Sequence, residues 1–355
     1  MILGLDIGGA NTKTASSDGL LAKSVYLPLW KNSPLNEVLR LLALQEPQAV
    51  AVVITGELAD CFSCKREGIE KLTAAVKRAF SCPVYFWGAG GFAWTDPLEL
   101  AAANWSASAA FLAREIGDYL FVDMGSTTTD LIPIKKGEVL AAKTDFLRLA
   151  GGELVYMGLL RTRLDALLPS AMIRGQKVPL APEFFAIMAD ARLALGRISE
   201  ERYACETPDG AGTDREAALR RLARSVCADL EEIGEALALA IAEQACESQM
   251  SILVAAMKRQ AEKHGLTKVA AAGIGEGLIA QAAAFLGLEC LRLSEKYGAE
   301  ISDVFPAYAV ARLAETDVPE IARVYDVAIT INNIDITMMT IFSPECASAH
   351  LIKLK

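Results

Sequence analysis

The sequence is poor in histidine. Of its 355 residues only His264 and His350 are histidines, and neither belongs to a recognisable motif. A Ser–His–Asp or Cys–His catalytic system is therefore not expected, and neither is a metal site built from several histidines. Acid–base chemistry in this chain must depend on carboxylate, lysine or tyrosine side chains.

An excess of positive charge is also missing, since 35 Lys and Arg face 44 Asp and Glu and the net charge is −9. Nucleic-acid binding needs a basic face, so no nucleic-acid partner is expected. The chain has no apolar run of about 18 residues and no signal-peptide pattern, so we expect a cytoplasmic protein without a membrane span. Of eight cysteines only Cys61 and Cys64 are closely spaced. Without a second pair, this spacing favours reduced thiols over zinc or redox chemistry.

The most informative feature present is a short pattern that occurs twice. It reads ILGLDIGGANTKTASSDG near the N-terminus and LFVDMGSTTTDLIPIKKG further on, so that Asp6 corresponds to Asp123 and Gly8 to Gly125. In each copy a β-prone apolar run ends in the Asp, a Gly/Ser/Thr turn follows, and a second β-prone run comes next. The pattern predicts two similar strand–turn–strand units.

Turns of this kind suit a phosphate, because backbone N–H groups and small hydroxyls gather around one point. An Asp at a strand end suits hydrated Mg²⁺, which takes oxygen ligands. We therefore expect Asp6 and Asp123 to bind Mg²⁺. Taken alone, the first turn is equally consistent with an ordinary β-turn. The expected phosphate contacts, including a later glycine-rich loop, are Gly8, Gly9, Asn11, Thr12, Lys13, Gly125, Ser126, Thr127, Thr128, Gly273 and Gly275.

Candidate catalytic residues follow the predicted strand 49–54. Polar side chains at the carboxyl ends of strands commonly line the site in open α/β sheets. Glu57, Asp60 and Lys65, with Asp130 after the second turn, are candidates for acid–base or ammonium-binding roles. Helix capping and surface charge explain the first three equally well.

Several aromatic residues lie close together in one segment that is rich in Gly and Ala. They could form a platform for a flat ring, although packing between domains is the commoner use of such side chains. The members of this aromatic cluster are Phe86, Trp87, Phe92, Trp94 and Trp105.

The predicted elements describe an α/β chain in which a three-strand unit recurs. Expected strands are 2–6, 11–17, 20–27, 49–54, 83–86, 119–123, 127–134, 138–143, 269–272 and 288–293. Expected helices are 33–46, 65–80, 107–114, segments of 215–264, and 306–314. From these we predict a first domain over 1–105, a second over 106–320 with an inserted, partly helical cap at about 150–215, and a tail over 321–355. The tail contains a predicted β-hairpin, 324–331 and 334–342, that could pair with a sheet edge or with a second subunit in a homo-oligomer, although an ordinary edge hairpin without function is the commoner case.

These features resemble the actin, sugar-kinase and Hsp70 superfamily. Within it the chain is similar to the hydantoinase/oxoprolinase-related group of tetrahydromethanopterin-linked C1-transfer proteins. The resemblance covers about residues 1–314 and implies two ribonuclease-H-like domains around a central cleft. It depends on ILGLDIGGANTK, PLWKN, TGELADCF, Ala103-Asn104-Trp105, VDMGSTTTDLIPI, Leu159-Leu-Arg-Thr162, TPDGAG and CADLE.

The resemblance also implies an activity, because members of this group act in methanofuran biosynthesis. It implies a transferase that joins 5-aminomethyl-3-furanmethyl diphosphate to γ-glutamyltyramine and releases diphosphate, with Mg²⁺ as cofactor. Its partners would then be a small-molecule diphosphate and a phenolic amide. Two alternatives remain open: an ATP-dependent kinase or ring-opening hydrolase, and a non-enzymatic nucleotide-sensing or scaffold protein.

Overall fold

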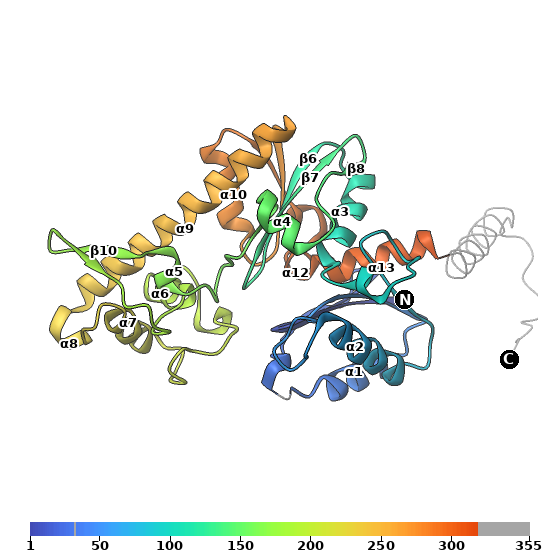
Figure 1. Ribbon diagram of the computed structural model, residues 1–355, viewed down its shortest axis with the longest axis horizontal. Helices are drawn as coiled ribbons and strands as arrows, with labels where there is room; N and C mark the ends of the chain where they lie inside the picture. The colour runs from blue at the N-terminus through green and yellow to red at the C-terminus, as the bar shows by residue number, and fades with distance from the viewer. Residues whose placement is uncertain (32, 319–355) are drawn as a thin grey trace, which may run out of the picture.

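Two β-sheets with the same strand order form the body of the molecule (Figure 1). The computed structural model describes residues 1–31 and 33–318. The first sheet has the order β3-β2-β1-β4-β5, with β1 (Ile2–Gly8), β2 (Asn11–Ser16), β3 (Ala22–Tyr26), β4 (Ala49–Thr55) and β5 (Val84–Phe86). The second has the order β8-β7-β6-β12-β13, with β6 (Tyr119–Met124), β7 (Thr129–Lys135), β8 (Glu138–Val139), β12 (Lys268–Ala272) and β13 (Glu289–Arg292), and β9 (Leu154–Val155) also pairs with β7.

The two sheets also share their strand directions. In each, the three strands of the repeated unit are antiparallel, and the two later strands run parallel to its first strand. The register at the two turns is equivalent, because Ile7 pairs with Thr12 and Met124 pairs with Thr129. The two similar units predicted from the repeat, and the ribonuclease-H-like α/β fold implied by the family resemblance, are thus confirmed.

Helices cover both faces of the first sheet, which is why β1 and β4 are almost entirely buried. Leu3, Leu5 and Ile7 pack in one core with α1 (Leu35–Ala43) and α2 (Lys65–Ala79). On the other face the strands meet α13 (Phe305–Asp317), which also packs on α3 (Asn104–Glu115) and lies between the two sheets (Figure 1). A side chain at Gly4 would put its Cβ 1.8 Å from the Ala307 carbonyl oxygen, so a glycine here allows the close approach of α13.

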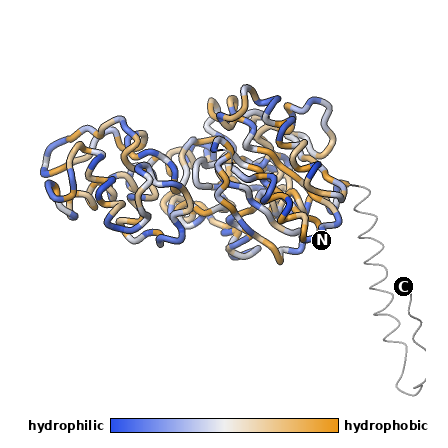
Figure 2. The backbone as a smooth tube through the Cα atoms, turned by 90° about the horizontal axis from the view of Figure 1, so that it is seen from below, coloured by the Kyte–Doolittle hydropathy of each residue, from blue (hydrophilic) through white to orange (hydrophobic). Residues whose placement is uncertain are grey.

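The cap is the lobe on the left of Figure 1, and it is joined to the body by α9 (Glu235–His264) (Figures 1 and 2). Its elements continue past residue 215, where the sequence placed the end of the insertion. They are α5 (Leu164–Leu167), β10 (Ser170–Ile173), β11 (Gln176–Pro179), α6 (Met188–Ala194), η3 (Glu200–Arg202), α7 (Arg215–Arg224) and α8 (Leu230–Ile233). The remaining elements are η1 (Leu29–Lys31), η2 (Pro97–Leu100), α4 (Asp145–Gly151), α10 (Glu276–Phe285), α11 (Leu293–Tyr297) and α12 (Ala299–Asp303).

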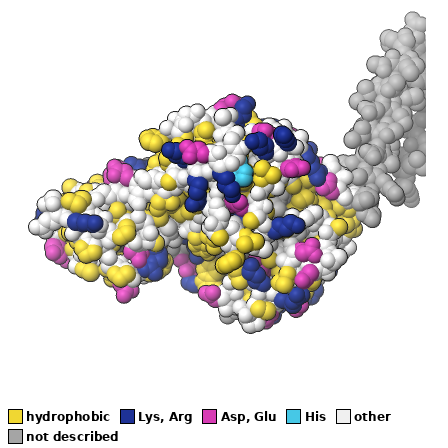
Figure 3. Space-filling view, turned by 45° about the horizontal axis from the view of Figure 1, so that its top comes forward, with side chains coloured by type: hydrophobic (Ala, Val, Ile, Leu, Met, Phe, Trp, Pro, Cys, Tyr) yellow, Lys and Arg dark blue, Asp and Glu magenta, His cyan; other side chains and the backbone are white. Residues whose placement is uncertain are grey.

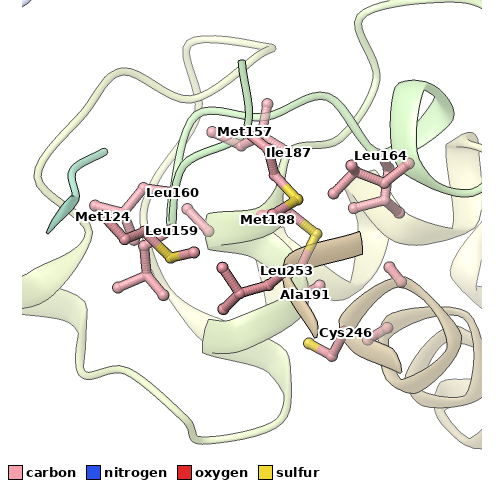
Figure 4. Close-up of a cluster of buried hydrophobic side chains, with 14 of the residues drawn as sticks. Met124, Met157, Leu159, Leu160, Leu164, Ile187, Met188, Ala191, Cys246 and Leu253 are labelled. Carbon is pink, nitrogen blue, oxygen red and sulfur yellow. The ribbon is translucent and has the colours of Figure 1, made fainter. Parts of the chain in front are cut away.

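One hydrophobic core runs from the second sheet into the cap. Figure 4 shows its central part, where Met124 at the end of β6 lies among Leu159 and Leu160, with Met188 of α6 and Leu253 of α9 close by. Because these side chains are buried together, the position of the cap is coupled to the strand that carries the second turn.

Among the residues described, no helix combines the length and the apolar composition that crossing a membrane requires. The predicted hairpin at 324–331 and 334–342, and the homo-oligomer it was expected to support, lie outside the described residues.

Candidate functional site

The two turns, far apart in sequence, touch each other. The side-chain amide of Asn11 in the first turn donates a hydrogen bond of 3.2 Å to the Ser126 hydroxyl in the second. Each turn lies at the end of two antiparallel strands. A parallel strand lies beside each of them, β4 next to β1 and β12 next to β6, so the two turns have equivalent neighbours. The repeat therefore forms one site from two halves of the chain.

Two buried carboxylates lie at this junction, one from each half. Asp6 is 3% exposed at the end of β1, and Asp123 is 7% exposed at the end of β6. Burial raises the pKa of Asp6, whereas the Lys13 ammonium and a 3.2 Å hydrogen bond from the Thr55 hydroxyl lower it. Burial also raises the pKa of Asp123 and of Asp303, and Lys13 offsets part of that rise. A single ammonium thus faces three carboxylates.

The glycine-rich loop after β12 packs directly on the end of β6. Gly273 has a φ of +83°, and a Cβ there would lie 2.3 Å from Asp123 Oδ1. The Gly275 amide donates a 3.0 Å hydrogen bond to the Met124 carbonyl oxygen. Only residues without side chains allow this contact, so the loop forms a wall beside Asp123.

A second series of charges begins at the end of β4. Glu57 is 2% exposed, and burial raises the pKa of its carboxyl, with Lys65 lowering it and Asp145 raising it. Arg148, itself 1% exposed, donates a 2.8 Å hydrogen bond to Asp145 and a short one to Asp130. The structure therefore brings Glu57, Lys65 and Asp130 into one connected region.

Asp60 has a different environment from the other three candidates. Its side chain is exposed, and within the described part of the chain it has no hydrogen bond or ion pair. Lys65 begins α2 and is half-buried.

The cap reaches the second turn through Arg161. The Arg161 backbone amide donates to the Ser126 carbonyl oxygen at 2.8 Å, and its guanidinium donates to the Thr127 hydroxyl at 3.1 Å. The same guanidinium lies 5.1 Å from the centre of the Trp30 ring. One side chain of the cap segment thus contacts both halves of the body.

Two ion pairs complete the contact between cap and body. Lys31 of η1 lies 2.5 Å from Glu206, and Arg202 of η3 lies 3.8 Å from Asp303. All four side chains are partly exposed, so these pairs favour one cap position without adding much stability. We infer that they help the cap to remain over the junction of the turns.

Several residues of this site were not predicted as site residues. Asn104, which donates a hydrogen bond that lowers the pKa of Asp6, was noticed only as part of the Ala-Asn-Trp motif. Asp145 and Arg148 lie on the short helix α4, and Asp303 ends α12. No local pattern distinguishes these three, because an isolated charged residue on a short helix resembles ordinary surface.

The aromatic cluster serves packing where the structure shows its contacts. Trp87 and Phe92 meet edge to face at 5.0 Å, and the Trp87 ring nitrogen donates to the Ser106 hydroxyl at 2.9 Å. Trp105 is buried with the Arg148 guanidinium 4.3 Å from its ring centre. The contacts of Trp87, Phe92 and Trp105 are therefore packing contacts.

Two ribonuclease-H-like sheets whose turns meet over buried acids define the actin, sugar-kinase and Hsp70 class of fold. The chain belongs to the hydantoinase/oxoprolinase family, whose sequence model matches residues 48–317.

Two relatives share one name. The chain is 40% identical over 324 residues to the (4-{4-[2-(gamma-L-glutamylamino)ethyl]phenoxymethyl}furan-2-yl)methanamine synthase of Methanocaldococcus jannaschii, which covers 89% of this chain and 98% of that protein. It is 34% identical over 214 residues to the synthase of that name from Methanococcus vannielii. That alignment covers 59% of this chain and 96% of the relative. A glucokinase of the ROK family from Streptomyces griseus, solved with glucose and AMPPNP, aligns with a TM-score of 0.46 at 14% identity over 88% of this chain and 98% of that one.

Asp123 should make the stability of the metal-free protein depend on pH. Burial raises the pKa of this carboxyl to about 7; Lys13 lowers it, and Asp130 and Asp6 raise it. The folded pKa is thus above the ordinary value of 3.8. Between these values the folded protein binds more protons than the unfolded chain, so the free energy of unfolding falls as pH rises. From about pH 5 to about pH 8 we expect a fall of about 2 to 3 kcal/mol.

Urea unfolding with a chelator present, repeated across this pH range, measures that fall. Asp123→Asn should flatten the dependence, whereas Asp60→Asn, which removes an exposed carboxylate, should leave it as in the unaltered protein. A pH dependence that Asp123→Asn does not change would contradict the assignment.

Proposed function

We propose that this protein is an enzyme of methanofuran biosynthesis that transfers a furanmethyl group from a diphosphate to a phenol. The substrates are 5-aminomethyl-3-furanmethyl diphosphate and γ-glutamyltyramine, and the products are an aryl furanmethyl ether and diphosphate. The observation that carries the proposal is the meeting of the two turns around Lys13, with buried Asp6 and Asp123, in a chain 40% identical to a synthase whose length it covers almost completely.

Mg²⁺ fits the residues at this junction. The Asp123 Oδ1 atom is buried and has no hydrogen-bond partner within the described residues, which is costly unless a cation or a donor reaches it. No group of three or more His, Cys, Asp or Glu side chains is placed to hold a metal in the part of the chain that the structure describes. That agrees with magnesium, which is usually bound by one or two carboxylates together with phosphates and water. When bound by Asp6 and Asp123, Mg²⁺ would neutralise negative charge on the diphosphate.

The turns would hold the leaving group. Backbone N–H groups at Gly8 and Gly9, and the hydroxyls of the second turn, can donate to diphosphate oxygens, whereas the Gly125 and Gly275 amides already donate to the Thr128 and Met124 carbonyl oxygens. Lys13 would place its ammonium on the same oxygens, where negative charge increases as the carbon–oxygen bond to diphosphate breaks. The furan ring stabilises positive charge on the departing carbon, so stabilising the diphosphate is the main task of the protein.

Glu57 is the residue we propose as the general base. One of its carboxylate oxygens, Oε2, is buried and has no hydrogen-bond partner in the described residues, and burial raises the pKa of this carboxyl. A raised pKa brings a carboxylate closer to that of the phenol it must deprotonate. Asp130 is already bound by Arg148, so it is less available as a base. In the reaction the phenol oxygen bonds to the furanmethyl carbon, the phenolic proton passes to Glu57, and diphosphate leaves with the electron pair.

Water must be kept away from the developing cation. The contacts of Arg161 with Trp30 and Thr127 bring the cap segment against both halves of the site. Closure over bound substrates would exclude water and position the phenol.

The test is to incubate the purified chain with Mg²⁺ and both substrates and to analyse the mixture by mass spectrometry. We expect the coupled ether and one diphosphate for each ether formed, without any nucleotide. No ether, together with phosphate release from ATP, would instead support a kinase or hydrolase. Glu57→Gln should lower ether formation more at neutral than at high pH, because phenolate forms without a base as the pH approaches the phenol pKa of about 10.

A further inference from the structure

Three arginine side chains are buried in the described part of the molecule, and one of them lacks a carboxylate partner. Arg148 and Arg221 each form ion pairs with two aspartates. Arg192, on α6, is only 6% exposed, and no Asp or Glu among residues 1–31 and 33–318 forms an ion pair with it. A buried charge without a counter-charge is unfavourable, so this one calls for a partner from outside the chain.

The few contacts of the Arg192 guanidinium leave it able to bind a ligand. One terminal nitrogen donates a 2.5 Å hydrogen bond to the Gln249 side-chain oxygen, and Nε is buried without any partner in the described residues. A guanidinium has five N–H donors, so most of its capacity is unused.

Arg192 borders an open surface cavity of about 380 Å³ between α6, α9 and α10. Cavities of this size hold small molecules. The cavity lies where the cap joins the body, and Figure 3 shows these two lobes. The apolar part of its lining comes from Cys246, Met250 and Leu278. Most of the polar residues that line it are charged.

The charges around the cavity leave one cation and one anion without a partner. Arg197 and Glu243 neutralise each other in an ion pair of 2.5 Å. Glu247 is exposed beside the cavity and forms no ion pair within the described ranges. The two unpaired charges are therefore the Arg192 guanidinium and the Glu247 carboxylate, which together match a molecule with both an anionic and a cationic group.

We propose that this cavity binds an α-amino acid. Its carboxylate would accept hydrogen bonds from Arg192, its ammonium would lie beside Glu247, and an apolar side chain would contact Met250 and Leu278. A carboxylate on a guanidinium forms a charge-assisted hydrogen bond, which is about twice as strong as a neutral one. A polyanion such as diphosphate fits less well, because the unpaired Glu247 carboxylate would repel it.

The cavity connects to the phosphate turns through one side chain. Gln249, which accepts from Arg192, donates a 2.8 Å hydrogen bond to the Gly158 carbonyl oxygen. Gly158 packs so closely on the second turn that a Cβ there would lie 2.3 Å from the Thr127 amide nitrogen. Binding at Arg192 therefore has a direct route to the position of the second turn. The inference depends only on these contacts and not on the proposed reaction.

Isothermal titration calorimetry of the full chain tests the proposal. Mg²⁺ and diphosphate should be present throughout, so that the junction of the turns is occupied. L-Methionine and L-leucine are the first probes, and we expect a Kd of about 1 mM or tighter for at least one of them. The matching acid without an amino group, 4-methylpentanoate, should bind several-fold more weakly than L-leucine, because it lacks the ammonium.

Two variants and one control test whether the amino acid binds at Arg192 and Glu247. Arg192→Met should weaken binding at least about tenfold, the loss of a charge-assisted contact. Glu247→Gln should weaken it less, and Arg220→Met, which removes an exposed arginine of α7, should not change it. Arg192→Met removes an unpaired buried charge, so its melting temperature without ligand should equal or exceed that of the unaltered protein. If that variant does not fold, Glu247→Gln, at an exposed position, still tests the site. No binding of either amino acid up to about 10 mM, or equal affinity in all three variants, would overturn the proposal.

Discussion

Replacing Lys13 with methionine is expected to lower kcat for ether formation by about 10²- to 10³-fold. Lys13 lies on β2 directly opposite Asp6 in the strand register. Its ammonium offsets part of the rise that burial causes in the pKa of Asp6, Asp123 and Asp303, yet in the described residues no ion pair holds it. It is therefore available to the diphosphate. A charge that meets the increasing negative charge on the leaving group stabilises the transition state more than the ground state.

Lys23→Met is the matched control, because Lys23 lies on the neighbouring strand β3 and is exposed. The Lys23→Met variant should keep the activity of the unaltered protein. Single-turnover measurement with saturating substrates separates kcat from binding, and a thermal melt with Mg²⁺ confirms that each variant is folded. Equal activity of Lys13→Met and Lys23→Met would show that Lys13 does not act on the reacting groups.

Replacing Arg148 with glutamine is expected to lower the free energy of unfolding by about 3 to 5 kcal/mol. Arg148 is 1% exposed and lies between Asp130 and Asp145, so its loss leaves the buried Asp130 carboxylate and the half-buried Asp145 carboxylate without a counter-charge. Trp105 would also lose the guanidinium that packs on its ring. Urea unfolding at neutral pH measures the change.

Restoring charge balance should recover much of this loss. The double variant Arg148→Gln/Asp130→Asn leaves only Asp145 unpaired, and that side chain is 31% exposed. As a control, Arg114→Gln breaks a two-bond pair with Asp317 in which the arginine is 49% exposed, and it should cost about 1 kcal/mol or less. A double variant no more stable than Arg148→Gln would mean that packing, and not charge, dominates at this position.

The sequence was most informative where structure is local. The β-prone runs around Asp6 and Asp123 predicted two hairpins, because strand alternation and turn chemistry depend on neighbouring residues. The duplication then predicted two sheets of one kind, and both have the order and directions of the ribonuclease-H-like fold. Helix α3 was expected over 107–114 and begins at Asn104, a small shift at an element end.

Boundaries set by packing were harder to predict. The cap continues through α7 and α8 because their apolar residues, such as Leu222, join the core that contains Met188 and Met257. Helical periodicity indicates that a segment buries one face, but it does not say which partner covers that face.

Two glycine- and hydroxyl-rich turns, with an Asp before each and a Lys after the first, could be inferred from the sequence alone. These follow from a few adjacent residues, so no other part of the chain is needed to infer them. Three features became visible only in the folded chain. Asn11 meets Ser126, and Glu57, Asp145, Arg148 and Asp130 form one series of charges. Arg192 is buried with no carboxylate partner among the described residues. Each of these contacts joins residues from separate elements, and which elements meet is decided by how the whole chain buries its apolar surface.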